Sequence, residues 1–257
     1  MKVQEFGVEH EKKILLIPGN MMCWRQFEAV IPLLSEDFRV IAVSTDGYDG
    51  TGETTFTTAE ASAEKLEEYI REHLNSEIDL VFGESFGSAT AGNLFHRQRV
   101  RVNALILSGP QYMSLGPLNA LLKAIIPGNQ YRLLGRIESM GKLPLLLRLY
   151  TRGDDQALMK QFAFMPPNIS LQTLQNCMDE ALALYKQIDD YKPEPEARVS
   201  IWYGAKEPNM KTAVKKLRRA FPSAEDHPFP GFGHGEIISH PDLMAAEIRR
   251  FLETIST

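Results

Sequence analysis

The fold is decided by the stretch Leu80-Val81-Phe82-Gly83-Glu84-Ser85-Phe86-Gly87-Ser88. An apolar run, typical of a buried strand, leads into the pattern Gly-x-Ser-x-Gly, and a segment rich in small residues follows. A sharp strand-to-helix turn with this pattern lifts a serine hydroxyl clear of the backbone. Gly83 and Gly87 have no Cβ, so the strand and the helix can approach closely. The pattern predicts that Ser85 is a nucleophile; the alternative is an ordinary strand–turn–helix that contains a serine.

Short apolar runs recur on both sides of this stretch and alternate with helix-like segments. The runs cover residues 14–17, 39–43, 78–82, 104–107 and 199–203. The helix-like segments between most of them cover residues 24–34, 59–74 and 86–97. Buried strands that alternate with helices predict an α/β fold, in which helices cover both faces of a mostly parallel sheet. The residues up to about Val8 are expected to add an antiparallel edge strand.

The alternation breaks after residue 110. Helix-like segments then cover residues 118–126, 131–140, 143–150, 155–164 and 170–188, with Pro127-Gly128 and Pro166-Pro167 among the breaks. Ser170 is a candidate N-cap of the last of these helices. We therefore expect an α/β core formed by residues 1–110 and 196–257. Residues 111–195 are expected to form a helical lid inserted into that core.

The composition excludes several classes of function. The 257 residues are 44% hydrophobic and 24% charged, and the net charge of −5 includes no basic block, so nucleic-acid binding is not expected. Cys23 and Cys177 lie far apart and without neighbouring metal ligands, so we expect no disulfide, no metal, no cofactor and a reducing compartment.

The chain also lacks targeting and membrane signals. Its first residues contain no apolar segment typical of a signal peptide, and no run approaches the roughly 18 apolar residues of a membrane span. These observations predict a cytoplasmic protein without a membrane span. Nothing in the sequence requires more than a monomer, although a homodimer is equally compatible with it.

A serine hydroxyl needs a general base before it can attack at neutral pH. His234 lies between glycines in Gly231-Phe232-Gly233-His234-Gly235, after an expected strand over about residues 224–228 and before an expected helix over 241–252. Glycines allow such a loop to bring an imidazole over the edge of the sheet. The other five histidines lack this setting, so His234 is the predicted base; a loop histidine with a structural hydrogen bond is the alternative.

The base in turn needs an acid that orients it. Glu207 lies in Gly204-Ala205-Lys206-Glu207-Pro208, directly after the run 199–203, and is the predicted acid. Asp226 is the second candidate, although we expect it within a strand. Asp154 and Asp155, in the expected lid, are weaker candidates.

Two backbone N–H groups are expected to stabilise the oxyanion of a tetrahedral intermediate. One is the amide of Phe86, directly after the nucleophile. The other is the amide of Asn20, in the loop Pro18-Gly19-Asn20-Met21 that follows the first central strand. The alternative for this loop is a plain turn that ends a strand.

These motifs, in the chain order serine, acid, histidine, resemble the α/β-hydrolase superfamily, in its lid-bearing branch of serine esterases and related hydrolases. The resemblance spans about residues 10–110 and 196–257 and implies the α/β-hydrolase fold with an inserted helical lid. The stretch 46–52 resembles the loop that often borders the family's active site. Two positions depart from the family pattern: Pro18-Gly19 replaces the usual His-Gly, and Glu207 replaces the usual Asp.

The resemblance implies a serine hydrolase. Its expected substrate is a carboxylic ester or thioester of a small, partly apolar molecule, cleaved through a Ser85–His234–Glu207 triad and an acyl-enzyme. Candidate pocket residues are Met21, Met113, Phe164 and Met165. A C–C bond hydrolase or a lyase with the same triad is one alternative, because the fold supports several reactions. A non-catalytic ligand-binding protein is another.

Overall fold

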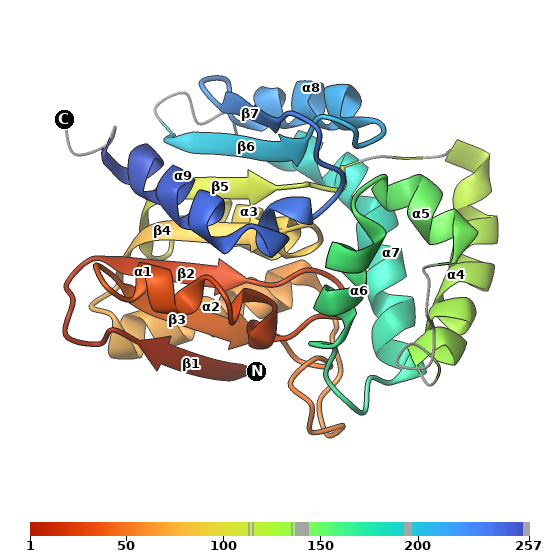
Figure 1. Cartoon of the computed structure of the whole chain (residues 1–257), viewed down its shortest axis with the longest axis horizontal. Helices are drawn as coiled ribbons and strands as arrows, with labels where there is room; N and C mark the ends of the chain where they lie inside the picture. Colours follow the sequence, from red (N-terminus) through yellow and green to blue (C-terminus); the bar gives the residue numbers. More distant parts are fainter. Residues whose placement is uncertain (113, 115, 135, 137–143, 193–196, 254–257) are drawn as a thin grey trace.

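The computed structural model describes every residue except 113, 115, 135, 137–143, 193–196 and 254–257, and its centre is a seven-stranded sheet. The strands are β1 (Lys2–Phe6), β2 (Lys13–Ile17), β3 (Arg39–Ser44), β4 (Glu77–Glu84), β5 (Arg101–Ser108), β6 (Val199–Gly204) and β7 (Glu225–Phe229). They lie in the order β1-β3-β2-β4-β5-β6-β7 (Figure 1). Only β1 is antiparallel to its neighbour; the other strands pair in parallel. The predicted fold class and edge strand are confirmed.

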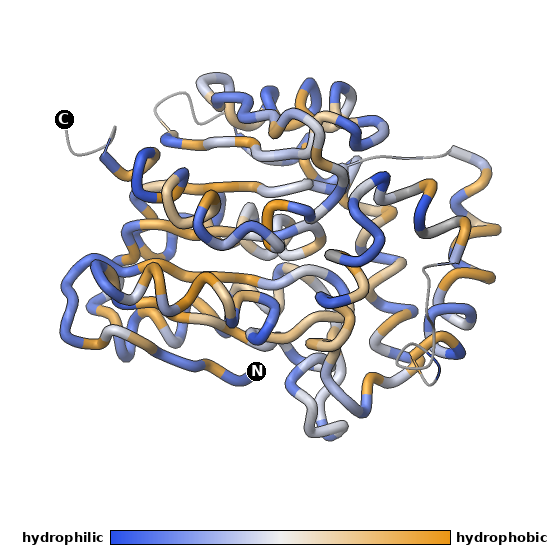
Figure 2. Tube along the Cα trace, viewed as in Figure 1, coloured by the Kyte–Doolittle hydropathy of each residue, from blue (hydrophilic) through white to orange (hydrophobic). Residues whose placement is uncertain are grey.

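Successive residues of the strands are buried on opposite faces of the sheet. In β2, Leu15 and Ile17 belong to one apolar cluster, and Ile14 and Leu16 belong to the other. The first cluster includes side chains of α2 (Ala59–His73), α3 (Gly87–Arg97) and α8 (Met210–Ala220). The second includes side chains of α1 (Ile31–Leu34) and α9 (Pro241–Glu253). Burial on both faces explains why the central strands are mostly continuous apolar runs; Figure 2 shows much of their length as hydrophobic.

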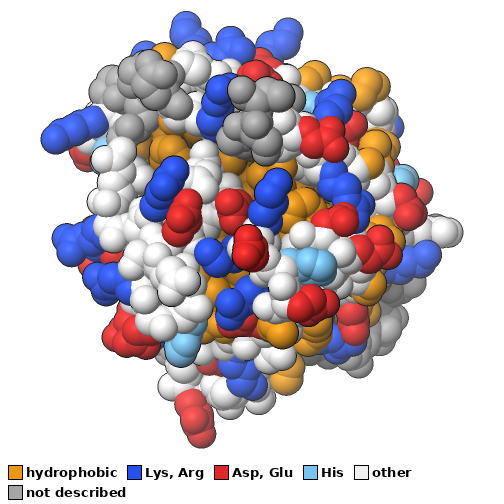
Figure 3. Space-filling view, turned by 90° about the vertical axis from the view of Figure 1, so that its left-hand side faces the viewer, with side chains coloured by type: hydrophobic (Ala, Val, Ile, Leu, Met, Phe, Trp, Pro, Cys, Tyr) orange, Lys and Arg blue, Asp and Glu red, His pale blue; other side chains and the backbone are white. Residues whose placement is uncertain are grey.

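Helices fill the interval between β5 and β6. They are α4 (Asn119–Leu134), α5 (Leu145–Thr151), α6 (Asp155–Phe162) and α7 (Leu171–Gln187), with the 3-10 turns η2 (Gly116–Leu118) and η4 (Ile188–Asp190) at either end. These helices lie beyond the carboxyl ends of the strands (Figure 1). On the opposite side of the molecule, basic and acidic side chains intermingle (Figure 3). The division into a core and a lid domain stays a prediction.

Two expected helix boundaries are wrong. The break expected at Pro127-Gly128 is absent, because α4 continues through both residues. A proline inside a helix removes one backbone hydrogen bond. Here Pro127 is buried and α4 packs along α7, so tertiary contacts compensate for the lost bond. The helix expected over residues 24–34 is instead a 3-10 turn, η1 (Trp24–Phe27), followed by the single turn of α1.

The predicted N-cap of α7 is confirmed. The side chain of Ser170 accepts a hydrogen bond from the backbone N–H of Thr173, as an N-cap does. Thr58 caps α2 in the same way. Within the described part of the chain, no helix has both the length and the apolar character that crossing a membrane requires.

The turn between β4 and α3 depends on two glycines. A Cβ on Gly83 would lie 2.7 Å from the carbonyl oxygen of Gly87, and a Cβ on Gly87 would lie 2.5 Å from the carbonyl oxygens of Ile17 and Pro18. Ser85, between them, has a φ of 50°, in the left-handed region that residues other than glycine rarely occupy. The close approach of β4 to α3 therefore requires a glycine at Gly83. The close approach of α3 to the end of β2 requires one at Gly87.

We expect Gly87→Ala to destabilise the protein by roughly 2 to 3 kcal/mol, since backbone atoms of β2 would have to move. Gly128→Ala is the matched control, because a Cβ there meets nothing within 4 Å and alanine favours a helix. Urea denaturation of both variants measures the two free energies of unfolding. Equal stability of the two variants would contradict the steric role of Gly87.

Candidate active site

The structure brings Ser85 and His234 together, although they lie 149 residues apart in the chain. The strand-to-helix turn presents Ser85 at the carboxyl end of β4, and its Oγ lies 2.9 Å from Nε2 of His234. His234 lies in the loop between β7 and the 3-10 turn η5 (Glu236–Ser239). This distance fits a hydrogen bond from the serine hydroxyl to the imidazole.

Glu207 completes a chain of three side chains. Its Oε2 lies 2.8 Å from Nδ1 of His234, and its Oε1 accepts a hydrogen bond of 2.7 Å from the backbone N–H of Gly204. The side chain of Glu207 is buried. A carboxylate at Nδ1 favours the tautomer that carries its proton there, which leaves Nε2 free to accept the proton of Ser85.

The alternative acids lie elsewhere. Asp226 is on β7 and forms an ion pair with Arg218, and Asp155 forms one with Arg148. Asp154 accepts a hydrogen bond from the backbone N–H of Gln156. Glu207 is therefore the candidate acid that the structure brings to His234.

The environment raises the pKa of His234 above its ordinary value of 6.5. Burial alone would lower this pKa, because it disfavours the charged imidazolium. The hydrogen bond and the negative charge of Glu207 outweigh the effect of burial, and Glu84 adds a smaller effect in the same direction. The imidazole is thus a better base than a free histidine.

The loop after β2 lies against the nucleophile. A Cβ on Gly19 would be 3.3 Å from Cβ of Ser85. The backbone N–H of Gly19 donates to Oε1 of Gln26 at 2.9 Å, so this amide is already engaged. The hydroxyl of Tyr48 donates to Oδ1 of Asn20 at 2.7 Å. Among the hydrogen bonds recorded between described residues, the backbone amides of Asn20 and Phe86 have no acceptor, which suits donors to a bound oxyanion.

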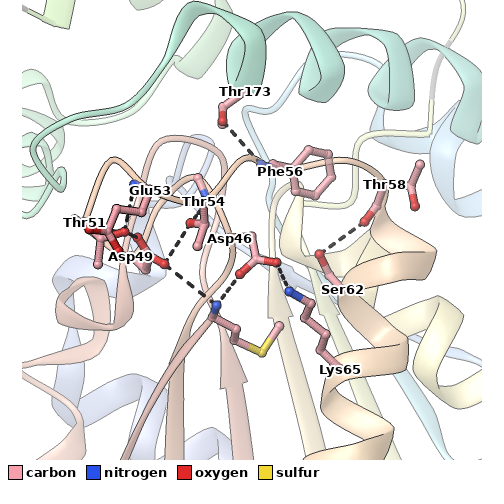
Figure 4. A network of polar contacts seen from close by, with 12 residues as sticks. Asp46, Asp49, Thr51, Glu53, Thr54, Phe56, Thr58, Ser62, Lys65 and Thr173 are labelled. Carbon is pink, nitrogen blue, oxygen red and sulfur yellow. Dashed lines mark hydrogen bonds and ion pairs between the residues drawn. The ribbon is translucent and has the colours of Figure 1, made fainter.

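Tyr48 belongs to the polar loop after β3, which the sequence indicated as a border of the site. Asp49 organises this loop by accepting hydrogen bonds from Thr51 and Thr54, and Asp46 binds Lys65 and the amino group of Met1 (Figure 4). Farther along, the backbone N–H of Phe56 donates to Oγ1 of Thr173 on α7 (Figure 4). The loop therefore connects the sheet to the inserted helices.

Three of the candidate pocket residues lie in the loop after β2 or in the segment after α6. Met21 is buried, and Phe164 and Met165 follow α6 and are half-buried. The carbonyl oxygen of Phe164 accepts a hydrogen bond from Sγ of Cys23, which connects this segment to the loop after β2. Met113 lies outside the described residues.

Sequence reasoning missed Glu84, which directly precedes the nucleophile. Its carboxyl group is fully buried beside the triad. Burial raises the pKa of Glu84 to about 7; the charge of His234 and an interaction with the Ser108 side chain oppose this shift, and the charge of Glu207 adds to it. A carboxyl residue at the end of an apolar strand, directly before the serine, was the signal in the sequence.

Cys23 and Cys177 are both buried and unpaired by any disulfide. In the part of the chain that the structure covers, no three histidine, cysteine or acidic side chains lie close enough to share a metal ion.

Known proteins resemble this chain along most of its length. A curated relative, the pimeloyl-[acyl-carrier protein] methyl ester esterase of Edwardsiella ictaluri (strain 93-146), is 26% identical over 258 residues, which cover 95% of this chain and 94% of that protein. An alpha/beta hydrolase family protein from Desulfitobacterium hafniense superposes with a TM-score of 0.83 at 22% identity and covers 98% of this chain and 100% of its own.

MenH from S. aureus superposes with a TM-score of 0.75 at 16% identity, over 100% of this chain and 98% of its own. The two structural likenesses establish a common fold. A family model described as alpha/beta hydrolase fold matches residues 12–241, which include Ser85, Glu207 and His234. The chain therefore belongs to the α/β-hydrolase family of enzymes.

Proposed function

We propose that this protein is a serine hydrolase that cleaves a carboxylic ester, or a thioester, of a small and partly apolar substrate. The observation that carries the proposal is the continuous chain from Ser85 Oγ to His234 Nε2 (2.9 Å) and from His234 Nδ1 to Glu207 Oε2 (2.8 Å). Both distances fit hydrogen bonds in the orientation that activates a serine.

The reaction begins when Ser85 Oγ bonds to the carbonyl carbon and its proton passes to Nε2 of His234. The carbonyl oxygen becomes an oxyanion, which the backbone amides of Asn20 and Phe86 stabilise. The bond to the leaving group then breaks as His234 returns the proton to that group. Water, deprotonated by His234, attacks the acyl-enzyme, and the second tetrahedral intermediate releases the acid and restores Ser85.

The class of substrate is inferred from the site and from similar proteins. The Edwardsiella relative is named for hydrolysis of a methyl ester, and a structural neighbour from Thermogutta terrifontis, at 18% identity, is described as an esterase. Met21, Phe164 and Met165 are proposed to contact the apolar part of the substrate. A panel of p-nitrophenyl esters with stepwise longer acyl chains tests this class, and turnover at useful rates would favour ester hydrolysis over the C–C hydrolase alternative.

We expect a fluorophosphonate to form a bond from Ser85 Oγ to phosphorus with loss of fluoride, and peptide mapping by mass spectrometry to locate the adduct on Ser85. Ser85→Ala should prevent labelling and lower kcat for an ester substrate by about 10⁴-fold or more. Ser223→Ala, which changes a serine away from the site, is the control. Labelling elsewhere in folded protein, with ester turnover retained in Ser85→Ala, would refute the proposal.

The pH dependence should follow His234, whose neutral form is the base. Since its pKa is raised, kcat/KM should increase with pH along a limb centred above 6.5. Glu207→Gln should lower kcat by about 10⁴-fold and move that limb to lower pH, because it removes the charge that raises the pKa. Asp226→Asn, which changes the second candidate acid, should leave both unchanged. A full pH–rate profile of the wild type, Glu207→Gln and Asp226→Asn checks this. Equal losses of kcat in the two variants would argue against Glu207 as the acid.

Glu84 should give the stability of the protein its own pH dependence. Its folded pKa of about 7 exceeds the value of 4.5 for an unperturbed glutamate, so the folded state binds the proton more tightly. The free energy of unfolding should therefore fall by on the order of 3 kcal/mol as pH rises from about 4.5 through 7. Urea denaturation at several pH values should find this slope reduced in Glu84→Gln but not in Glu68→Gln, an exposed control. The same slope in all three proteins would contradict the assignment.

A further inference from the structure

A row of side-chain amides runs from the loop after β2 to the loop that carries His234. Gln26 Oε1 accepts from the backbone N–H of Gly19 at 2.9 Å, and Gln26 Nε2 donates to Gln161 Oε1 at 3.4 Å. Gln161 Nε2 then donates to the carbonyl oxygen of Gly235 at 3.1 Å and to Oγ of Ser239 at 3.0 Å. The inserted helix α6, through Gln161, thus contacts both loops at once.

Burial and direction make this row specific. Gln26 and Gln161 are each only 6% exposed, so an amide group left without its partner would be costly. Each amide accepts from the side of Gly19 and donates toward Gly235, and neither can reverse without placing two donors or two acceptors face to face. The row therefore fixes the distance between the two loops.

The loop after β2 needs such support. Pro18 has no side-chain hydrogen-bond donor, and among the described residues Gln26 is the side chain that accepts from the Gly19 amide. This bond fixes the peptide between Pro18 and Gly19, and Tyr48 holds the Asn20 side chain. The backbone amide of Asn20 follows directly in this loop, which lies against Ser85 at Gly19.

The loop that carries His234 depends on the inserted helices as well. The backbone N–H of His234 donates to the carbonyl oxygen of Thr151, at the end of α5, at 2.6 Å. A Cβ on Gly233 would lie 2.2 Å from the backbone nitrogen of Gly153, so the two backbones are in direct contact. Gln161 joins this contact at Gly235, the residue after the imidazole.

We propose that Gln161 is a positioning residue of the active site. It sets the Asn20 amide through Gln26 and the His234 imidazole through the carbonyl group of Gly235, so that the oxyanion donor and the base face Ser85 together. This role rests on the proposed serine hydrolase function. Gln161 acts through other residues and touches no reacting atom.

The expected effect follows from geometry. A displacement of about 1 Å in a catalytic group can cost about 100-fold in rate, and loss of one oxyanion donor costs about 10²- to 10³-fold in kcat. Gln161 supports such groups without being one, so its loss should lower kcat by about 10- to 100-fold. KM should change little, because the change acts on the transition state more than on the bound substrate.

The test uses Gln161→Met, which keeps the length of the side chain and removes its hydrogen bonds. Lys160→Met, an exposed neighbour on the same helix, is the matched control. Besides kcat and KM for a p-nitrophenyl ester, the inhibition constant of an alkylboronic acid is measured. Such an acid bonds reversibly to Ser85 Oγ through boron and forms a tetrahedral adduct with an oxygen in the oxyanion site.

In Gln161→Met, kcat/KM should fall and the boronic acid inhibition constant should rise by similar factors of about 10 to 100. Gln26→Met should change kcat/KM and the inhibition constant in the same way. In the double variant, neither constant should change more than in the single variant that has the larger effect. Since Gln26 lies outside the inserted helices, it also serves if Gln161→Met does not fold.

If Gln161 has a role in folding alone, Gln161→Met should have a lower urea midpoint, but its kcat/KM and inhibition constant should equal those of Lys160→Met. That result, with an active wild type, would overturn the positioning role and leave the proposed function intact. A wild type that neither hydrolyses any ester nor binds the boronic acid would overturn the proposed function, and the positioning role with it.

Discussion

The close approach of β4 and α3 is the constraint on which the rest of the site depends. Gly83 allows it because a Cβ there would meet atoms of α3, and Gly87 allows α3 to lie against the end of β2, where a Cβ would meet the carbonyl oxygens of Ile17 and Pro18. Ser85, in this turn, has a positive φ of 50°, and its hydroxyl lies at the carboxyl end of β4 within reach of His234. The strain of this conformation, of order 1–3 kcal/mol, is balanced by the apolar clusters on both faces of the sheet.

Parallel pairing of the strands brings the other groups to Ser85. Because β2, β4, β5, β6 and β7 point the same way, the loops after β2, β6 and β7 emerge at one edge, with the turn after β4 between them. The loops also touch: a Cβ on Gly204 would lie 2.3 Å from the carbonyl oxygen of Gly233, so the backbones that carry Glu207 and His234 are in contact. Glycines act here, as at the turn, by removing atoms from a crowded junction.

The sequence predicts those parts that depend on local pattern. Strands buried on both faces are mostly apolar, so the runs beginning at Ile14, Arg39 and Val199 can be recognised as strands from the sequence. Turn geometry restricts which residues can stand near Ser85 and His234, so these two residues can also be recognised. Glu84 and Gln161 escaped notice because their importance comes from what surrounds them after folding. The break expected at Pro127 is wrong for the same reason, since the packing of α4 along α7 allows the helix to continue through the proline. The catalytic assignments remain predictions that the geometry supports.

The backbone bond between His234 and Thr151 has a consequence for how such proteins can be recombined. An inserted segment is usually regarded as a module that can be exchanged between relatives to change selectivity. Here the exchange of α5 and α6 would also remove the acceptor of the His234 amide, the glycine that faces Gly233 and the amide that faces Gln26. A chimera would need those three features in the donor segment. The segment from Thr151 to Gln161 is therefore best kept with the core, and α4 is the part that can be exchanged.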